Sequence, residues 1–128
     1  LVVDYEGLDP KKKLIITGHS LGGATATLIA DLLWESGNKN IALVTAGAPR
    51  PGGRRLRKRL EGLEQYRFVH GNDIVPNTPP WLVGYVHPHH KIQLEDIEET
   101  RLDGVTDHNI GDYVKAAEKH FADKKVIL

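Results

Sequence analysis

A serine bracketed by two glycines lies where an apolar strand turns directly into a helix. Residues 14–17 form a β-branched run typical of a buried strand, and residues 20–35 carry apolar side chains at helical spacing. The segment that joins them, Gly18-His19-Ser20-Leu21-Gly22, fits the pattern Gly-x-Ser-x-Gly. Such a turn either serves close packing of strand against helix or raises a nucleophilic serine above the end of the strand.

The rest of the chain alternates strands with helices. Strands are predicted at 41–45 and 66–70, with an edge strand or bent pair from 85 to 94, and helices are predicted at 54–63 and 109–121. This order predicts an α/β fold with a mostly parallel sheet flanked by helices. No linker divides the 128 residues, so we expect one domain. The positions expected to face the core are Leu21, Ala24, Leu28, Leu32 and Leu33 or Trp34 in the first helix, Leu56, Leu60 and Leu63 in the second, and Ile110, Tyr113, Val114 and Ala117 in the last.

Composition excludes several classes of protein. Lys plus Arg and Asp plus Glu both number 17, and this balance argues against a dedicated nucleic-acid binder. The sequence has no cysteine, which excludes a disulfide scaffold, a thiol nucleophile and a cysteine zinc site. No apolar run of about 18 residues is present to span a membrane.

A serine nucleophile requires a base, and the base requires an orienting acid. On an α/β scaffold these follow in the order serine, acid, histidine, each on a loop after a strand. Asp73 directly follows the strand at 66–70, and His108 lies between the last predicted strand and the last helix. We therefore predict Ser20 as nucleophile, Asp73 as acid and His108 as base. The N–H of Leu21, at the start of a helix, is predicted to stabilise the developing oxyanion.

Other polar residues compete for these roles. His19 is expected to point away from Ser20 and to pack, while Asp107 and Asp112 are candidate helix caps. We expect neither His70, at a strand end, nor His120, inside a helix, to act as the base. His87, His89 and His90 form the main rival group, but they offer no third ligand at metal-binding spacing, so we predict no metal. The basic run at 54–59 is interpreted as a solvated helix face, with contact to anionic lipid headgroups or phosphates as the alternative.

Four stretches together resemble the class 3 (fungal-type) lipases of the α/β-hydrolase fold. They are Thr17-Gly18-His19-Ser20-Leu21-Gly22-Gly23-Ala24, Thr45-Ala46-Gly47-Ala48-Pro49-Arg50-Pro51-Gly52, Asn72-Asp73-Ile74-Val75-Pro76-Asn77-Thr78-Pro79-Pro80 and Gly84-Tyr85-Val86-His87, followed by the Asp107-His108 pair and Tyr113. The resemblance implies hydrolysis of esters through an acyl-enzyme on Ser20, without a cofactor. It also implies a structural role for His87 and an apolar acyl-binding rim formed by Pro79, Pro80, Trp81 and Leu82.

The resemblance covers only the second half of full-length members. Residues 1–13 are too short to supply their upstream strands, their second oxyanion donor and their lid, so we expect a partial or minimal lipase-like domain over residues 1–128. An exposed sheet edge is then expected to favour self-association. The predicted function is a serine carboxylester hydrolase acting on lipid or short-chain esters, with at most peripheral contact with lipid interfaces. The alternative is a catalytically silent lipase-like scaffold or assembly module.

Overall fold

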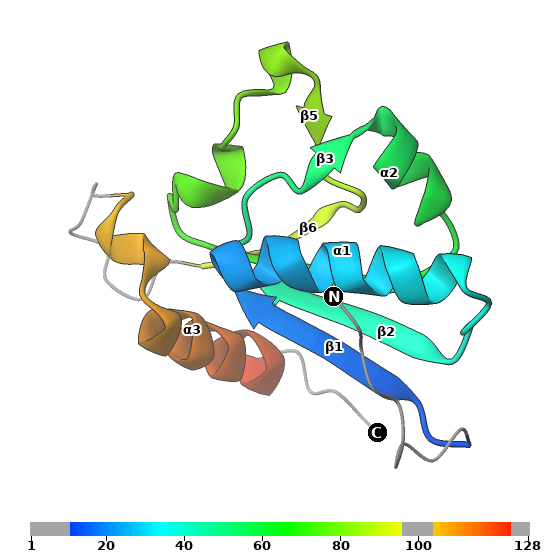
Figure 1. Cartoon of the computed structure of the whole chain (residues 1–128). Helices are drawn as coiled ribbons and strands as arrows, with labels where there is room; N and C mark the ends of the chain where they lie inside the picture. Colours follow the sequence, from blue (N-terminus) through cyan, green and yellow to red (C-terminus); the bar gives the residue numbers. More distant parts are fainter. Residues whose placement is uncertain (1–10, 96–103, 124–128) are drawn as a thin grey trace.

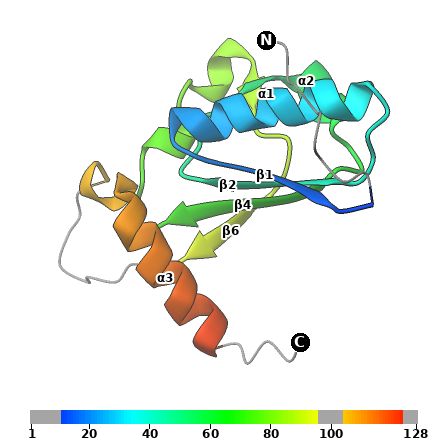
Figure 2. The same ribbon diagram turned by 60° about the horizontal axis from the view of Figure 1, so that its bottom comes forward.

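A four-stranded parallel sheet forms the centre of the chain. The computed structural model describes residues 11–95 and 104–123. Strands β1 (Leu14–His19), β2 (Ile41–Ala46), β4 (Glu64–His70) and β6 (Lys91–Leu94) lie in the order β1-β2-β4-β6 and are all parallel. Helices α1 (Leu21–Glu35) and α2 (Arg54–Arg59) cover one face, and α3 (Ile110–Asp123) lies on the opposite face (Figures 1 and 2). The predicted α/β class with a mostly parallel sheet is confirmed.

The register brings the carboxyl ends of the strands to one edge of the sheet. His19 pairs with Ala46, Ala46 pairs with Phe68, and His70 pairs with Leu94. Because the strands run in the same direction, the loops that follow them start side by side. The segments that begin at Ser20, Gly47 and Gly71 therefore share this edge.

The main apolar core fills the space between the sheet, α1 and α2. Its buried members are Ala26, Ala30, Leu33, Ile41, Leu43, Leu56, Leu60 and Leu63. The second helix ends at Arg59, earlier than predicted, but its three leucines are buried as expected. Arg59 also pairs with both carboxylate oxygens of Asp31 on α1, at 2.9 and 2.5 Å, which joins the two helices.

Helix α1 contacts the sheet through small residues. The prediction that Leu21, Leu28 and Leu32 face the core is wrong, because all three are exposed. A Cβ on Gly23 would lie 2.6 Å from the Cβ of Ala48, so this end of the helix lies too close to the neighbouring loop for a larger side chain. The inward face is instead made of alanines and glycine together with Leu33.

Helix α3 buries only a narrow stripe of its surface. Tyr113 and Ala116 are buried against Leu94, with Ala117 partly buried beside them. Ile110 and Val114 are exposed, which corrects the prediction that they face inward. The reason is that α3 packs mainly against β4 and β6 of the sheet, so side chains at the margins of the stripe stay exposed.

The segment between β4 and β6 leaves the main sheet and returns to it. Short helices η1 (Val75–Asn77) and η2 (Trp81–Val83) lead to β5 (Tyr85–Val86), which pairs antiparallel with β3 (Gly52–Gly53). The predicted strand pair at 85–94 is therefore divided between two sheets. A last short helix, η3 (Thr106–His108), precedes α3. In the part of the chain that the structure describes, no helix is long and apolar enough to cross a membrane. The expectation about residues 1–13 falls mostly outside the described residues.

Candidate active site

The turn between β1 and α1 holds Ser20 in a strained backbone conformation. Its φ is 55° and its ψ is −132°, and among the described residues it is the only non-glycine residue with a positive φ. Such a conformation costs free energy and persists where the surrounding structure imposes it. The restraint is visible at Gly18, where a Cβ would lie 2.3 Å from the carbonyl oxygen of Gly22. Gly22 itself faces open space, so close packing depends on Gly18 and Gly23.

Ser20, His108 and Asp73 form one chain of hydrogen bonds, although they come from three separate loops. Nε2 of His108 lies 2.6 Å from Oγ of Ser20, and Nδ1 of His108 lies 2.8 Å from Oδ2 of Asp73. A carboxylate can only accept, so Nδ1 carries the proton and donates it to Asp73. Nε2 is then a free base that accepts the hydroxyl proton of Ser20. This arrangement can activate a serine for nucleophilic attack.

The carboxylate of Asp73 is buried and fixed at both oxygens. Oδ1 accepts a hydrogen bond from the backbone N–H of Val75 at 2.9 Å, and Oδ2 accepts a second bond from the hydroxyl of Tyr113 at 2.6 Å. Burial, and next the hydrogen bond to Asp73, raise the pKa of Tyr113, so its hydroxyl stays protonated and remains a donor. Tyr113 was expected only as a core residue. Its contact with Asp73 depends on the packing of α3 and has no local signal in the sequence.

The loop that carries His108 is attached to the sheet by its neighbours. Asp107 is buried, and its Oδ2 accepts the backbone N–H of Asn72 at 2.7 Å, which joins the loops of the acid and the base. The ring of His70 donates from Nδ1 to the carbonyl of Asp107 at 3.1 Å. Asp107 is therefore not a helix cap. The side chain of Asn109 caps α3 instead, through the N–H of Gly111.

His19 contacts the base directly. Its Nε2 donates to the backbone carbonyl of His108 at 2.9 Å, and the two rings stack with centroids 4.7 Å apart. His19 therefore has the packing role that was predicted, and the residue it packs against is His108. The sequence placed His19 beside Ser20 but gave no indication that His108 was its partner.

Gly47 lies against the side chains of Asp73, Tyr113 and His108. Its φ is +57°, and a Cβ there would lie 2.9 Å from Oδ2 of Asp73, 3.0 Å from the hydroxyl of Tyr113 and 3.1 Å from Cε1 of His108. In the sequence Gly47 stands out only as part of the stretch from Thr45 to Gly52 that carries the family resemblance. Its position shows that the segment after β2 forms a wall of the site.

The N–H of Leu21 is available at the start of α1. The N–H groups of Gly23 and Ala24 bond to the carbonyl of Ser20, whereas that of Leu21 has no acceptor among the described residues. A free N–H at a helix N-terminus is suited to stabilise negative charge beside the serine.

The residues predicted to form an acyl-binding rim lie on an exposed projection. Arg50 fixes its base by hydrogen bonds from Nη1 to the carbonyls of Asn77 and Pro79, the latter at 2.6 Å. Pro79 is partly buried and Pro80 is exposed. The side chains of Trp81 and Leu82 are 67% and 76% exposed. These four residues line none of the three cavities around Thr45, Leu60 and Asp73.

The remaining histidines and the basic run at residues 54–59 make no hydrogen bond to Ser20, His108 or Asp73 among the described residues. The ring of His87 donates from Nε2 to the carbonyl of Pro76 at 2.7 Å, which fits a structural role, while His89 and His90 are exposed. His120 lies on α3 beside Phe121. Among residues 11–95 and 104–123, no three His, Asp or Glu side chains are grouped to hold a metal ion. In the basic run, every cation is exposed, and Arg59 pairs with Asp31.

Comparison with known proteins identifies similar sequences and structures. The profile of the family described as Lipase (class 3) matches residues 4–83. A lipase of Rhizopus niveus is 41% identical over 85 residues, which cover 62% of this chain and 22% of that protein. The chain thus spans about a fifth of the length of this relative.

Solved structures show the same likeness. A mutant form of MDLA from Penicillium cyclopium has a TM-score of 0.65 and 33% identity, over 77% of this chain and 36% of that one. A triacylglycerol lipase, described as having a serine protease triad as its catalytic centre, has a TM-score of 0.58 and 35% identity, over 71% of this chain and 36% of its own.

Proposed function

Because this chain belongs to the class 3 lipase family, we propose that it is a serine carboxylester hydrolase that acts on lipid or short-chain esters. The single observation that carries the proposal is the continuous set of hydrogen bonds from Ser20 through His108 to Asp73. The proposal treats residues 1–128 as one lipase-like domain, because one sheet edge carries all three side chains.

The reaction proceeds through an acyl-enzyme. Oγ of Ser20 attacks the ester carbonyl while Nε2 of His108 takes the hydroxyl proton, and the imidazolium then gives this proton to the leaving alcohol. In the second half, Nε2 of His108 takes a proton from water as the water attacks the acyl carbonyl, and then gives this proton to Oγ of Ser20 as the bond between serine and acyl group breaks and the carboxylic acid leaves. Asp73 stabilises the imidazolium and keeps the proton on Nδ1.

The N–H of Leu21 supplies one hydrogen bond to the oxyanion. Tetrahedral oxyanions are commonly held by two donors, and loss of one costs about 10²–10³ in rate. We therefore expect slow hydrolysis by this chain unless a second donor comes from outside the described residues. A Ser-His-Asp triad with one oxyanion donor still accelerates hydrolysis above the rate in water, because the loss of one donor is smaller than the usual rate enhancement of an enzyme.

The test compares the purified chain with Ser20→Ala and with Ser36→Ala as a matched control. Ser36 lies at the other end of α1, where its hydroxyl bonds to the carbonyl of Leu33. Hydrolysis of p-nitrophenyl butyrate is expected to persist in Ser36→Ala and to fall to background in Ser20→Ala. A fluorophosphonate probe is expected to label the unmodified chain and Ser36→Ala only.

Two outcomes contradict the proposal. Background hydrolysis by the unmodified chain, together with no labelling of Ser20, means that the serine is not activated and favours the alternative of a silent scaffold. Hydrolysis that persists in Ser20→Ala places the nucleophile elsewhere.

A further inference from the structure

A cationic cavity of about 300 Å³ lies beside the loop that carries Asp73. Strands β4 and β6 and the helix η1 contribute to its lining, together with the segment around His87. Its charged and titratable side chains are Arg50, Arg67, Lys91, His87 and Asp73. This cavity is distinct from the surface around Ser20, which does not line it.

The sheet register places two of these cations together. Arg67 on β4 and Lys91 on β6 are register partners, so their side chains leave the sheet on the same face. Like charges opposite each other are destabilising unless something compensates them. Arg50 adds a third positive charge from the segment after β2.

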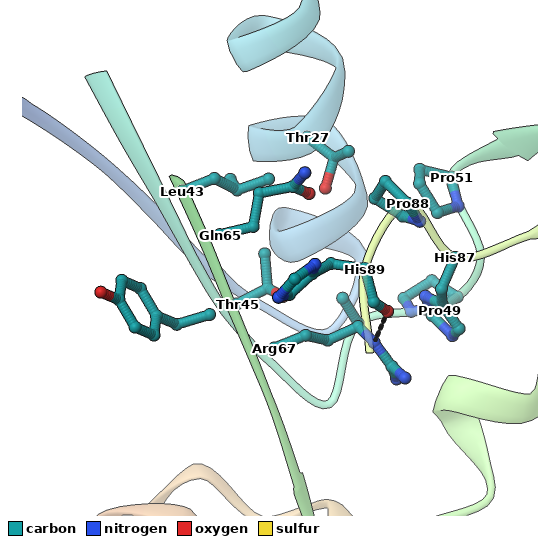
Figure 3. A pocket seen from close by; sticks show the side chains of 12 residues that line it. Thr27, Leu43, Thr45, Pro49, Pro51, Gln65, Arg67, His87, Pro88 and His89 are labelled. Atoms are coloured by element: carbon teal, nitrogen blue, oxygen red, sulfur yellow. Dashed lines mark hydrogen bonds between the residues drawn. The ribbon is translucent and has the colours of Figure 1, made fainter. Parts of the chain in front are cut away.

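Asp73 is the single carboxylate that lines this cavity. No carboxylate pairs with Arg50, Arg67 or Lys91 among the described residues. The negative charge of Asp73 offsets part of the positive charge, but its two oxygens accept hydrogen bonds from His108, Tyr113 and the backbone and not from these cations. Among the described residues, the only hydrogen bond of the Arg67 side chain runs from Nε to the carbonyl of His89 at 3.1 Å (Figure 3). Its two Nη groups therefore remain available.

The surroundings make the positive charge more costly. Burial, and next the charge of Arg50, lower the pKa of Arg67 to about 10. Burial, and next the charge of Arg67, lower the pKa of His87 to about 4, so its ring is neutral at pH 7. Figure 3 shows Arg67 extending from the sheet alongside the segment with His87 and His89. At pH 7 the cavity is thus lined by three cations, one carboxylate and a neutral imidazole, and its net charge is positive.

We propose that the cavity formed by Arg50, Arg67 and Lys91 is an anion site that binds a phosphate group. Three cations and one carboxylate leave a net double positive charge, which matches a phosphate dianion better than a ligand with a single carboxylate. The planar fork of an arginine fits two phosphate oxygens, and a lysine ammonium adds a third contact. The volume leaves room for a small group esterified to the phosphate.

The first experiment titrates the purified chain with inorganic phosphate at constant ionic strength and follows binding by calorimetry. Phosphate is expected to bind, and Lys91→Gln is expected to weaken its affinity about tenfold, which corresponds to about 1.4 kcal/mol. Arg67→Gln is expected to abolish binding. Lys58→Gln and Arg57→Gln remove exposed cations of α2 outside this cavity and serve as matched controls.

The second experiment distinguishes two sources of the phosphate. It uses Ser20→Ala, so that hydrolysis does not interfere, with sn-glycerol 3-phosphate in one arm and vesicles that contain phosphatidic acid in the other. Binding that depends on Lys91 in the first arm alone assigns the site to a soluble phosphate ester. Binding that depends on Lys91 in the vesicle arm assigns it to a lipid headgroup.

The proposal is overturned if phosphate at millimolar concentration does not bind the unmodified chain. Equal affinities of the unmodified chain and Lys91→Gln also overturn it, as does a loss of binding in Lys58→Gln rather than in Lys91→Gln. None of these measurements requires ester hydrolysis, so this inference and the proposed function can fail separately.

Discussion

At the scale of single residues, Gly47 is placed where a methyl group would meet three side chains of the site at once. We predict that Gly47→Ala strongly reduces ester hydrolysis, by more than tenfold, because the new Cβ would displace Asp73 and His108. The positive φ adds a backbone cost of about 1 kcal/mol in stability. The measurement is the rate of p-nitrophenyl butyrate hydrolysis together with the free energy of unfolding.

Gly37→Ala separates these two effects. Gly37 has a φ of +96°, and a Cβ there would meet nothing within 4 Å. The backbone cost should thus be similar in both variants, while only Gly47→Ala loses activity. An equal loss of activity in both, or none in Gly47→Ala, would show that the contacts of Gly47 do not restrain the site.

His87 predicts a dependence of stability on pH. Its pKa is about 4 in the folded chain and 6.5 as the ordinary value, because burial and next Arg67 and Arg50 disfavour its charged form, against the opposing hydrogen bond to Pro76. Below pH 6.5 the unfolded chain binds a proton that the folded chain rejects, so acid favours unfolding. The contribution is present above pH 6.5 and is lost as the pH falls toward 4.

We predict that His87→Gln reduces the loss of unfolding free energy between pH 7 and pH 4 by about 2 kcal/mol, after a discount for partial exposure. Glutamine keeps a donor for the carbonyl of Pro76 but does not titrate. Urea unfolding at both pH values is the measurement, and His90→Gln, at an exposed histidine, is the control. An equal loss of unfolding free energy between pH 7 and pH 4 in His87→Gln and in the unmodified chain would refute the prediction.

At the scale of secondary-structure elements, α1 and α3 show what the sequence could and could not predict. Both helices were placed correctly, because periodicity and the turn at Ser20 depend on local sequence. The buried face of α1 was not predicted correctly. The sheet lies so close to this helix that alanine and glycine fit against it, while Leu28 and Leu32 remain outside the core. The positions of the large apolar side chains Leu28 and Leu32 therefore indicated the wrong face of α1.

The candidate site shows the same division. The order of the strands was enough to select Asp73 and His108 as partners for Ser20, since each follows a strand at the same sheet edge. The residues that hold them, Tyr113 and His19, act across 40 and 89 positions of sequence. Contacts over such separations depend on packing, which local patterns do not encode.

The η2 projection leads to a prediction about substrate form. Trp81 and Leu82 are exposed apolar side chains next to the segment fixed by Arg50, so they are suited to contact a lipid surface. We predict that the double variant Trp81→Ser, Leu82→Ser hydrolyses an emulsified long-chain ester at least tenfold more slowly, because burial of each side chain in lipid contributes about 1.5–3 kcal/mol. Hydrolysis of dissolved p-nitrophenyl butyrate should change less than twofold.

The control for this variant is Leu28→Ser, Leu32→Ser, which removes two exposed leucines from α1. It should leave the ratio of the two activities unchanged. If the η2 variant loses both activities equally, these residues act on the acyl chain itself, as the acyl-rim prediction states, rather than on the lipid surface.

At the scale of the whole molecule, the two faces of the sheet are covered unequally. Leu14 and Ile16 pack against the core under α1, whereas Ile15 points to the opposite face and is 63% exposed. Helix α3 covers that face mainly at β4 and β6 (Figure 2). In the described part of the chain β1 pairs only with β2. The backbone N–H and C=O groups on its other side are therefore unpaired there, and they lie next to the apolar face that Ile15 occupies.

An open strand beside an apolar face favours pairing with a second copy. We predict that the chain self-associates at micromolar concentrations in sedimentation velocity experiments, and that Ile15→Lys shifts it toward the monomer, because a charge on the open face opposes association. Val83→Lys is the matched control, since Val83 is also 63% exposed but lies on η2. A monomer at all concentrations, or equal association of Ile15→Lys and Val83→Lys, would mean that this face and edge do not drive association. Association lost in Val83→Lys alone would move the contact to the η2 projection.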